Sequence, residues 1–338
     1  MSSVEEADAE VPVAAREFDH VILTRFSVRF AEAPPPDEDW LYYRWSFFCD
    51  ALAASAARQT VRDFHWLVFF DIDTPEWLRK EIDTLSPGLF APRFVSSWSS
   101  GVARQAVAEI ATSPYLITTR IDSDDAIAVQ FVEDVQSCFE HQASLYVNLL
   151  CGVQVERTGE VYRYDEPFGP FISYIEKRVD SELPRTVFFN LRHHASRSLA
   201  DVLNVVGPPR WMQIIHGTNI ANGVRGLRAR PEPFEADFQF DLPFDRRVDT
   251  SRYLRERVRS VFDLMRLWLL HPRYAGEFVV ARRLRRAGTQ VLPRVEEVSR
   301  SVGLPDWLRL VAAPVGRAVR KLDALWRLRR NRQRTRSS

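Results

Sequence analysis

The sequence predicts an α/β fold in which a mostly parallel sheet is flanked by helices. Through the first 140 residues, short apolar runs rich in β-branched residues alternate with amphipathic segments of helix length, which is the pattern of parallel strands joined by helices. The run that begins at Tyr115 is the clearest, because it ends in Asp122-Ser-Asp-Asp125, with three carboxylates within four residues. Open α/β sheets bind ligands at the carboxyl ends of their strands.

The elements of this first part follow from apolar periodicity and from the residues that begin helices. Asp39 is expected to cap the first helix, because an aspartate side chain can accept a bond from a backbone N–H of the first turn. Thr74-Pro75 is expected to begin the second helix, where proline is tolerated at the first position. The expected elements are, in chain order, a strand at His20–Val28, a helix from Asp39 through Leu52, a strand at Phe64–Asp71, a helix from Thr74, a strand near Arg93–Ser97, a helix at Ser100–Ala111, a strand from Tyr115 and a helix from Ala126 to about His141.

After residue 142 the pattern changes to hairpins and then to helices. Ala143–Glu156 and Glu160–Tyr164 alternate in polarity across Arg157-Thr-Gly159, which predicts a β-hairpin. Further strands or sheet edges are expected at Phe171–Lys177, at Thr186–Arg192 and at Trp211–Asn219, and helices from Asp249 onward.

These patterns divide the chain into three parts. Residues 1–17 are small and acidic and are expected to be disordered, 18–240 form the α/β domain, and 249–338 form a helical extension. The acidic N-terminus lacks an apolar signal core, and no apolar run approaches the roughly 18 residues of a membrane span. With three cysteines outside metal-ligand spacing, this predicts free thiols and a cytoplasmic location.

The acidic turn predicts a divalent-metal site. Three adjacent anions at a strand end repel one another, and a bound cation would relieve that repulsion. Magnesium sites usually combine one or two carboxylates with phosphate oxygens of the substrate, so Asp124 and Asp125 are candidates to bind a metal and a diphosphate. The structural alternative is a solvated turn whose carboxylates cap a helix beginning at Ala126.

Motifs around the turn resemble a known class of enzymes. Ala103-Arg-Gln, followed by Tyr115 and Asp122-Ser-Asp-Asp125, resembles the nucleotide-sugar-binding half of GT-A glycosyltransferases, although Gln105 and Val107 depart from the usual residues. A wider set is similar to a bacterial family of rhamnosyltransferases. That set comprises Leu23-Thr-Arg-Phe26, Trp40-Leu-Tyr-Tyr-Arg44 with Phe48, Gln59, Phe64-His-Trp-Leu-Val-Phe-Phe-Asp-Ile-Asp-Thr-Pro75, Thr119-Arg-Ile-Asp-Ser-Asp-Asp125 and Ile215-His-Gly-Thr-Asn219.

The resemblance implies a GT-A-like fold and the transfer of a sugar, such as rhamnose, from a nucleotide-diphosphate donor. The acceptor would be a glycan or a lipid-linked hydroxyl, and the anomeric carbon would be inverted. Asp122 would face the ribose or base, Asp124 would bind Mn²⁺ or Mg²⁺, and Asp125 would be a second ligand or would orient the first. His216 would complete the metal shell, the structural alternative being a hydrogen-bonded histidine after a strand.

The same resemblance places donor contacts on earlier strand ends. Thr24 and Arg25 would contact the nucleotide, with Arg25 able to pair with a diphosphate oxygen. Asp71 would hold the base, and Arg104 would touch phosphate or brace the acids, with structural ion pairs as the alternative for each arginine. The catalytic base stays unassigned because spacing does not choose among its candidates. Those candidates are Asp165, Glu166, Glu176, His193, His194 and Asp201.

Two other functions remain as alternatives. Asp71-Ile-Asp73-Thr-Pro resembles the nucleophile motif of haloacid-dehalogenase-type phosphatases, but the chain has only three lysines and lacks that family's Gly-Asp-x-x-x-Asp loop. Residues 305–338 carry ten Lys/Arg against two acids, which permits a non-enzymatic protein that binds nucleic acid through salt-dependent phosphate contacts. No nucleic-acid-binding motif accompanies these cations, so we expect no such partner.

The basic tail predicts a membrane contact more directly. Its apolar stripe includes Trp307 and Trp326 and is flanked by arginines, a pattern typical of helices that lie on an anionic membrane surface. Peripheral attachment at the inner face of the plasma membrane is therefore expected. The alternative is a helix packed on the catalytic domain, and Pro314 interrupts the helix in either case.

Overall fold

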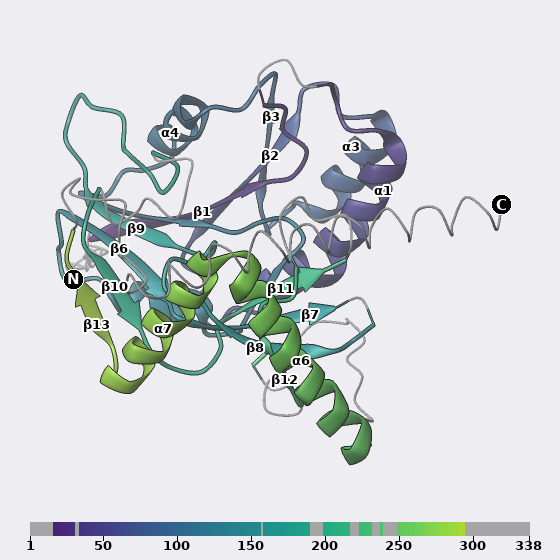
Figure 1. Ribbon diagram of the computed structural model, residues 1–338. Coiled ribbons are helices and arrows are strands. Elements are labelled where there is room, and N and C mark those ends of the chain that lie inside the picture. The colour runs from purple at the N-terminus through teal and green to yellow at the C-terminus, as the bar shows by residue number, and fades with distance from the viewer. Residues whose placement is uncertain are drawn as a thin grey trace, which may run out of the picture.

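Two β-sheets form the framework of the computed structural model (Figure 1). The structure describes residues 16–30, 34–156, 158–189, 199–216, 223–231, 237–238 and 249–294. The larger sheet has eight strands in the order β13-β10-β6-β9-β4-β1-β2-β3, and the smaller has five in the order β12-β8-β7-β11-β5. The mixed α/β architecture predicted from the sequence is confirmed.

The larger sheet is parallel from β3 through β2 and β1 to β4, and again between β6 and β10. Strand β9 lies antiparallel between β4 and β6, and β13 lies antiparallel at the edge. Its strands are β1 (Phe18–Arg25), β2 (His65–Asp71), β3 (Ala91–Val95), β4 (Tyr115–Arg120), β6 (Ser144–Leu149), β9 (Ser173–Lys177), β10 (Val202–Val205) and β13 (Gln290–Leu292).

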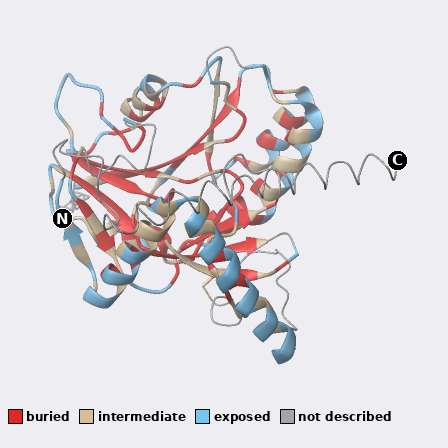
Figure 2. Ribbon diagram, viewed as in Figure 1, coloured by how far each residue is buried: buried red, intermediate tan, exposed pale blue. Residues whose placement is uncertain are grey.

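Both faces of the central strands are buried, because side chains alternate between two apolar clusters. Ile22 and Val68 belong to the cluster under one face, whereas Leu23 and Leu67 belong to the cluster on the other. Figure 2 shows these strands buried along their length. The first face is covered by α1 (Glu38–Phe47), η1 (Phe48–Ala53), α2 (Ala54–Ala56), α3 (Glu76–Leu85) and α5 (Phe131–Gln136), and the second by α4 (Ser100–Ala108).

The smaller sheet is reached by short crossings from the larger one. The acidic turn joins β4 to β5, and Leu150 alone separates β6 from β7. The sheet consists of β5 (Ala126–Ile127), β7 (Cys151–Glu156), β8 (Val161–Asp165), β11 (Trp211–Ile215) and β12 (Leu227–Ala229). The acidic turn therefore lies where the chain passes from one sheet to the other.

Three local predictions are wrong. The cap of α1 is Asp37, not Asp39, because Asp37 Oδ1 accepts from Trp40 N at 2.8 Å. No helix begins at Ala126, since Ala126 and Ile127 pair with β11 as a buried strand and α5 starts only at Phe131. The expected single strand at Ala143–Glu156 is two strands in different sheets, although the hairpin of β7 and β8 is confirmed.

Other predicted elements end earlier than expected or lie outside the described residues. Thr186 has a positive φ of 61° and begins a turn rather than a strand, and residues 190–198 lie outside the description. The same holds for most of the expected disordered N-terminus and for the basic tail from 295 onward. Cys49, Cys138 and Cys151 are free thiols, as expected.

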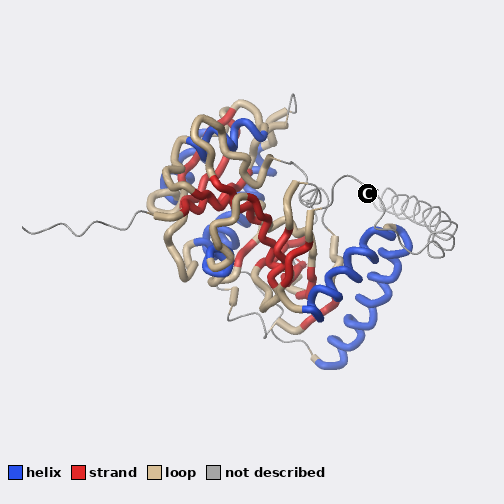
Figure 3. Tube along the Cα trace, turned by 90° about the vertical axis from the view of Figure 1, so that its left-hand side faces the viewer, coloured by secondary structure: helices blue, strands red, loops and turns tan. Residues whose placement is uncertain are grey.

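The described part of the C-terminal extension is mainly helical, as predicted. α6 (Thr250–Leu270) is capped by Asp249, which accepts from the backbone of Ser251 and Arg252, and α7 (Pro272–Ala287) follows it. Figure 3 shows the two helices side by side at one end of the molecule. The extension then returns to the body as β13, which pairs with β10. None of the helices described here combines the length and the apolar character needed to cross a bilayer.

We predict that Gly152→Ala lowers the free energy of unfolding by about 2 kcal/mol or more, because overpacking a buried site forces neighbouring atoms to move. A Cβ on Gly152 would lie 2.3 Å from the Trp211 ring, which is fully buried. Gly207→Ala is the matched control, since its added Cβ meets nothing within 4 Å. Urea unfolding of both variants is the measurement, and equal stabilities would contradict the packing account.

Candidate functional site

The four-residue acidic turn is divided between the two sheets. Asp122 faces arginines at the end of the larger sheet, whereas Asp124 and Asp125 bond to groups at the end of β11 in the smaller sheet. Strand β4 leads into the start of the turn and β5 follows its end, so the first carboxylate stays with the larger sheet and the last two lie against the smaller one. The turn thus has a cationic side and a side enclosed by α1 and β11.

Two arginines converge on Asp122. Arg120 Nη2 donates to Asp122 Oδ1 at 3.0 Å, and Arg25 Nη2 lies 3.7 Å from the same oxygen. Arg25 ends β1 and Arg120 ends the neighbouring parallel strand β4, so the sheet places both guanidinium groups at one edge. One carboxylate does not neutralise two guanidinium groups, and this edge therefore retains positive charge suited to an anion.

Aromatic rings surround Arg25. Its guanidinium carbon lies 5.3 Å from the Phe30 ring centroid, 5.7 Å from that of Trp98 and 5.1 Å from that of Phe188. Burial, together with the charge of Arg120, lowers the pKa of Arg25 to about 10, so it stays charged at neutral pH. Its Nε has no hydrogen-bond partner within the described chain.

The Asp124 carboxylate is the centre of the enclosed side. Asp124 Oδ2 forms a short ion pair with Arg44 Nη1 and lies 2.8 Å from His216 Nε2. Arg44 Nη2 also donates to Ser123 Oγ at 2.9 Å. Helix α1 presents Arg44, and β11 ends at the residue before His216. The structure therefore brings two predicted site residues, Asp124 and His216, into direct contact, and it adds an arginine to which the sequence analysis gave no role.

Aromatic residues of α1 hold His216 in place. The imidazole is fully buried, stacks on Phe47 with ring centroids 4.7 Å apart, and meets Tyr43 edge-on at 5.4 Å. The Tyr43 hydroxyl donates to the His216 carbonyl oxygen at 3.0 Å. These contacts fix the ring plane so that Nε2 faces Asp124.

Asp125 is the most buried acid of the turn. Its Oδ1 accepts from Ile214 N at 3.1 Å, which fastens the turn to β11. Burial raises the pKa of Asp125 well above its usual range, and the negative charges of Asp124 and Asp122 raise it further. The Asp125 side chain therefore holds its proton more tightly than a free aspartate does.

The remaining predicted donor contacts lie apart from Asp124. Thr24 is fully buried and its Oγ1 accepts from Trp66 Nε1 at 3.0 Å, which places it inside the core. Asp71 accepts two bonds from Arg29, at 2.5 and 3.0 Å, and this arginine also binds Asp73. The Asp71 carboxylate therefore holds the loop after β2.

Arg104 bonds to a loop rather than to the acidic turn in the contacts of the described residues. Its Nε donates to the carbonyl oxygen of Pro184 at 2.7 Å, and Nη2 donates to that of Leu183 at 2.9 Å. Arg104 thereby fastens α4 to the segment that follows β9.

The donor atoms of the turn fit a metal only in part. Asp124 Oδ2 and His216 Nε2 face one another, and a carboxylate oxygen with an imidazole nitrogen suits Mn²⁺. Within the described ranges, no group of three His, Cys, Asp or Glu side chains could hold a metal ion. A metal here would take its other ligands from substrate phosphate and water. It would also share the Asp124 Oδ2 atom with Arg44, which already forms an ion pair with that oxygen.

The described candidates for the catalytic base are all paired. Glu176 accepts from the backbone of Arg185 and Thr186 at 2.8 Å each, and Asp201 accepts from Arg294 N at 2.6 Å. His193 and His194 lie outside the described residues. The base stays unassigned.

The other two candidates line a separate cavity of about 560 Å³ between β8, α6 and α7. Arg285 pairs with Asp165 at 2.7 Å, and the Tyr164 hydroxyl donates to Glu166. Burial raises the pKa of the nearby Glu277 to about 7, with a smaller contribution from the charge of Glu166. The cavity is lined by charged side chains of β8, such as Asp165 and Glu166, and by charged and apolar side chains of the two helices.

Sequence reasoning did not assign three arginines. Arg120 precedes Asp122 by two positions and so lies on the same side of the strand, a signal that period-two reasoning could have used. Arg44 is far from its partners in sequence, 80 residues from Asp124. Arg29, which binds Asp71, is separated from it by a helix and a strand. Only the tertiary fold reveals those two pairs.

A family model described as "Putative rhamnosyl transferase" matches residues 35–228, a range that contains Arg44, the acidic turn and His216. No curated protein matches the chain.

Among solved structures, the chain is similar to S. aureus TarS 1–349 in complex with UDP-GlcNAc, at 15% identity over 39% of this chain and 34% of that one, with a TM-score of 0.26. It is similar to S. aureus TarS 1–349 at 11% identity over 75% of each chain, with a TM-score of 0.35. It is also similar to HddC from Yersinia pseudotuberculosis, at 10% identity over 59% of this chain and 89% of that one, with a TM-score of 0.28. The chain spans about a third of the first structure, and likenesses at these TM-scores carry no argument about function.

We predict that Arg44→Met lowers the free energy of unfolding by about 3 kcal/mol, since it leaves the buried Asp124 carboxylate without its cation. Arg62→Met is the matched control, because Arg62 is exposed and its side chain reaches only a backbone carbonyl. Chemical denaturation near pH 7 measures both. Similar losses in the two variants would contradict a structural role for the Arg44–Asp124 pair.

We predict that the free energy of unfolding falls between pH 4.5 and pH 7 partly because of Glu277, whose pKa rises from 4.5 to about 7 on folding. In that window the folded protein keeps the proton while the unfolded chain loses it, so stability decreases as pH rises. Glu277→Gln should flatten this decline, by about 1 kcal/mol once solvent screening of the partly exposed carboxylate is included. Denaturant titrations at pH 4.5, 6 and 7.5 measure it, and an unchanged slope would refute the assignment.

Proposed function

Because the chain belongs to the family described as putative rhamnosyl transferases, and is therefore a glycosyltransferase as its motifs predicted, we propose that it transfers a hexose such as rhamnose from a nucleotide-diphosphate donor. The observation that carries this proposal is the acidic turn with its two sides, one cationic and one centred on Asp124 and His216. A leaving diphosphate requires positive charge, and this strand end concentrates it.

We place the donor diphosphate at the cationic side of the turn. Arg25 and Arg120 supply two guanidinium groups against the single carboxylate of Asp122, and guanidinium groups bind phosphate through paired hydrogen bonds. The ring of Phe30 beside Arg25 is exposed and offers a surface for a nucleotide base. Asp71 and Arg104 would act indirectly, by holding the loops that border this edge.

We propose that Mn²⁺ or Mg²⁺ assists the reaction, with Asp124 and His216 as protein ligands. When bound, the ion would act as a Lewis acid that neutralises charge on the departing diphosphate. The buried Asp125 would stay bonded to β11 and would position the turn. Arg44 would orient Asp124 and would compete with the metal for its carboxylate oxygen.

The acceptor would be a glycan or lipid-linked hydroxyl, attacking the anomeric carbon with inversion. This reaction needs a side chain that removes the hydroxyl proton. We also propose, from the sequence pattern alone, that the basic tail attaches to an anionic membrane. The protein would then lie at the inner face of the plasma membrane.

The geometry at Asp71 weighs against the phosphatase alternative. A nucleophilic carboxylate needs an oxygen free to attack phosphorus, whereas both Asp71 oxygens accept bonds from Arg29. Asp73, which would be the acid or base, is paired with the same arginine.

We predict that one of dTDP-, UDP- or GDP-sugars raises the melting temperature by about 5 °C when supplied with Mn²⁺ at saturating concentration. Asp124→Asn should abolish the metal-dependent part of that shift, because the amide does not supply an anionic oxygen. Differential scanning fluorimetry measures it. Asp180→Asn, an exposed acid distant in sequence from the turn, should keep the full shift.

Two outcomes would count against the proposal. If no nucleotide sugar gives a metal-dependent shift in the native protein, metal assistance is wrong. If a purified phosphatase activity is lost in Asp71→Asn and kept in Asp124→Asn, the transferase assignment is wrong.

A further inference from the structure

Helix α6 presents an unusual apolar stripe to solvent. Six side chains spaced three or four positions apart, or adjacent, occupy one face of the helix, and each is 41–63% exposed. They are Leu254, Val258, Val261, Phe262, Met265 and Leu269. The stripe extends over roughly 22 Å at 1.5 Å per residue, and Figure 2 shows the helix exposed along most of its length.

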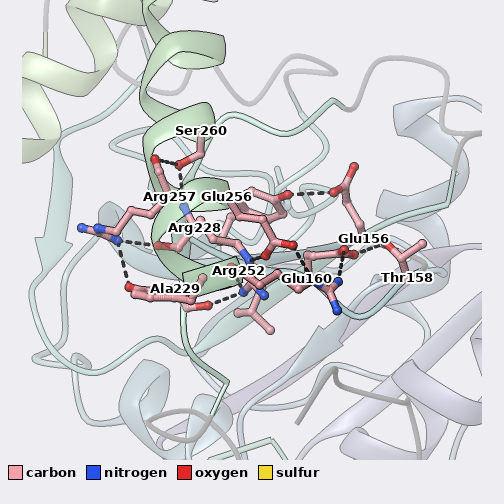
Figure 4. Close-up of polar contacts among 12 residues, drawn as sticks. Glu156, Thr158, Glu160, Arg228, Ala229, Arg252, Glu256, Arg257 and Ser260 are labelled. Atoms are coloured by element: carbon pink, nitrogen blue, oxygen red, sulfur yellow. Dashed lines mark hydrogen bonds and ion pairs between the residues drawn. The ribbon is translucent and has the colours of Figure 1, made fainter. Parts of the chain in front are cut away.

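The opposite face of α6 is fixed to the body by polar contacts (Figure 4). The fully buried Arg228 of β12 donates to Glu256 Oε2 at 2.9 Å, and Ser260 Oγ accepts from Arg228 N at 3.1 Å. Arg257 donates to the Arg228 carbonyl oxygen. A helix of a soluble protein usually turns its apolar residues inward. Helix α6 does so with Leu264, but its longer apolar stripe lies outside, and the polar anchors of the opposite face keep it there.

Positive charge accompanies the stripe. Helices α6 and α7 carry ten arginines against three acids. On a helical wheel, Arg255, Arg259 and Arg266 lie along one edge of the stripe, and all three are exposed. Arg259 lies 3.7 Å from Asp263, which is itself exposed.

The charges identify the class of partner. Two possible occupants would repel the arginines beside the stripe. One is the basic tail, which has ten Lys/Arg against two acids in residues 305–338, and the other is a second copy of the same helices. Nucleic acid would match the arginines but not the apolar side chains. An anionic lipid bilayer satisfies both, since interfacial helices insert apolar side chains while flanking arginines contact lipid phosphates.

We propose that α6 docks this protein on an anionic lipid bilayer through the stripe and its arginine edge. The helix lies along the surface, because its other face is anchored to β12. This site is separate from the tail, and it does not depend on which sugar is transferred or on the transferase activity itself.

The test is flotation of the full-length protein with vesicles of phosphatidylglycerol and phosphatidylcholine, against vesicles of phosphatidylcholine alone. The native protein should float with the anionic vesicles, and Val258→Glu/Phe262→Glu should lower the partition coefficient at least about tenfold. Arg255→Gln/Arg266→Gln should weaken flotation and reduce its dependence on salt. Val179→Glu is the matched control, as Val179 is 59% exposed and Val258 56%.

Each other result identifies a different occupant and overturns the proposal. Flotation of the double glutamate variant equal to that of Val179→Glu means that α6 does not contact lipid. A melting temperature several degrees lower in the double glutamate variant without lipid means that the stripe is covered by the chain's own tail. A dimer in lipid-free solution that this variant converts to a monomer means that the stripe joins two copies. Transferase assays are not needed for any of these readouts.

Discussion

The ion pair between Arg44 and Asp124 is the interaction on which the site depends. It brings together α1, the turn after β4 and the end of β11, three segments that are far apart in the sequence. His216 joins it through the same carboxylate oxygen, and the rings of Tyr43 and Phe47 hold that histidine in place. Because these groups are nearly all buried, each would be costly to leave without its partner.

This arrangement gives the site two alternative sources of positive charge. In the structure, the Arg44 guanidinium neutralises Asp124, and the histidine lies against the same oxygen. A divalent ion at that oxygen would have to compete with the guanidinium, and a substrate diphosphate would favour the ion by adding ligands. Metal affinity should therefore depend strongly on the nucleotide. The cationic side at Arg25 and Arg120 needs no such exchange, since those two groups already exceed the charge of Asp122.

The order of strands and helices and the acidic turn could be predicted from the sequence, because each is a feature of residues that follow one another in the chain. The continuous apolar runs of β1 and β2, whose side chains alternate between two buried clusters, are a property of consecutive residues. The helix expected at Ala126 was wrong because an apolar segment suits a strand as well as a helix, and the choice was made by pairing with β11, which lies 85 residues later in the chain. The partners Arg44 and Arg29 could not be predicted, since an arginine in a helix or loop carries no sign of which distant carboxylate it will meet. The resemblance to a family assigned the metal-binding roles to Asp124 and His216. The structure shows that a carboxylate oxygen and an imidazole nitrogen of these two residues lie in contact.

The placement of the acidic turn between two sheets has a mechanical consequence. The chain passes from the larger sheet to the smaller one at Asp122–Asp125. A second connection between the sheets consists of Leu150 alone. A ligand that bonds to the arginines at one end of the turn and to Asp124 at the other would link the two sheets across the turn. A bound ligand should slow the separation of β5 from β11, which are joined by a ladder of two residue pairs. The exchange of the amide protons between β5 and β11 would then report whether a ligand is bound, although these amides do not contact the substrate.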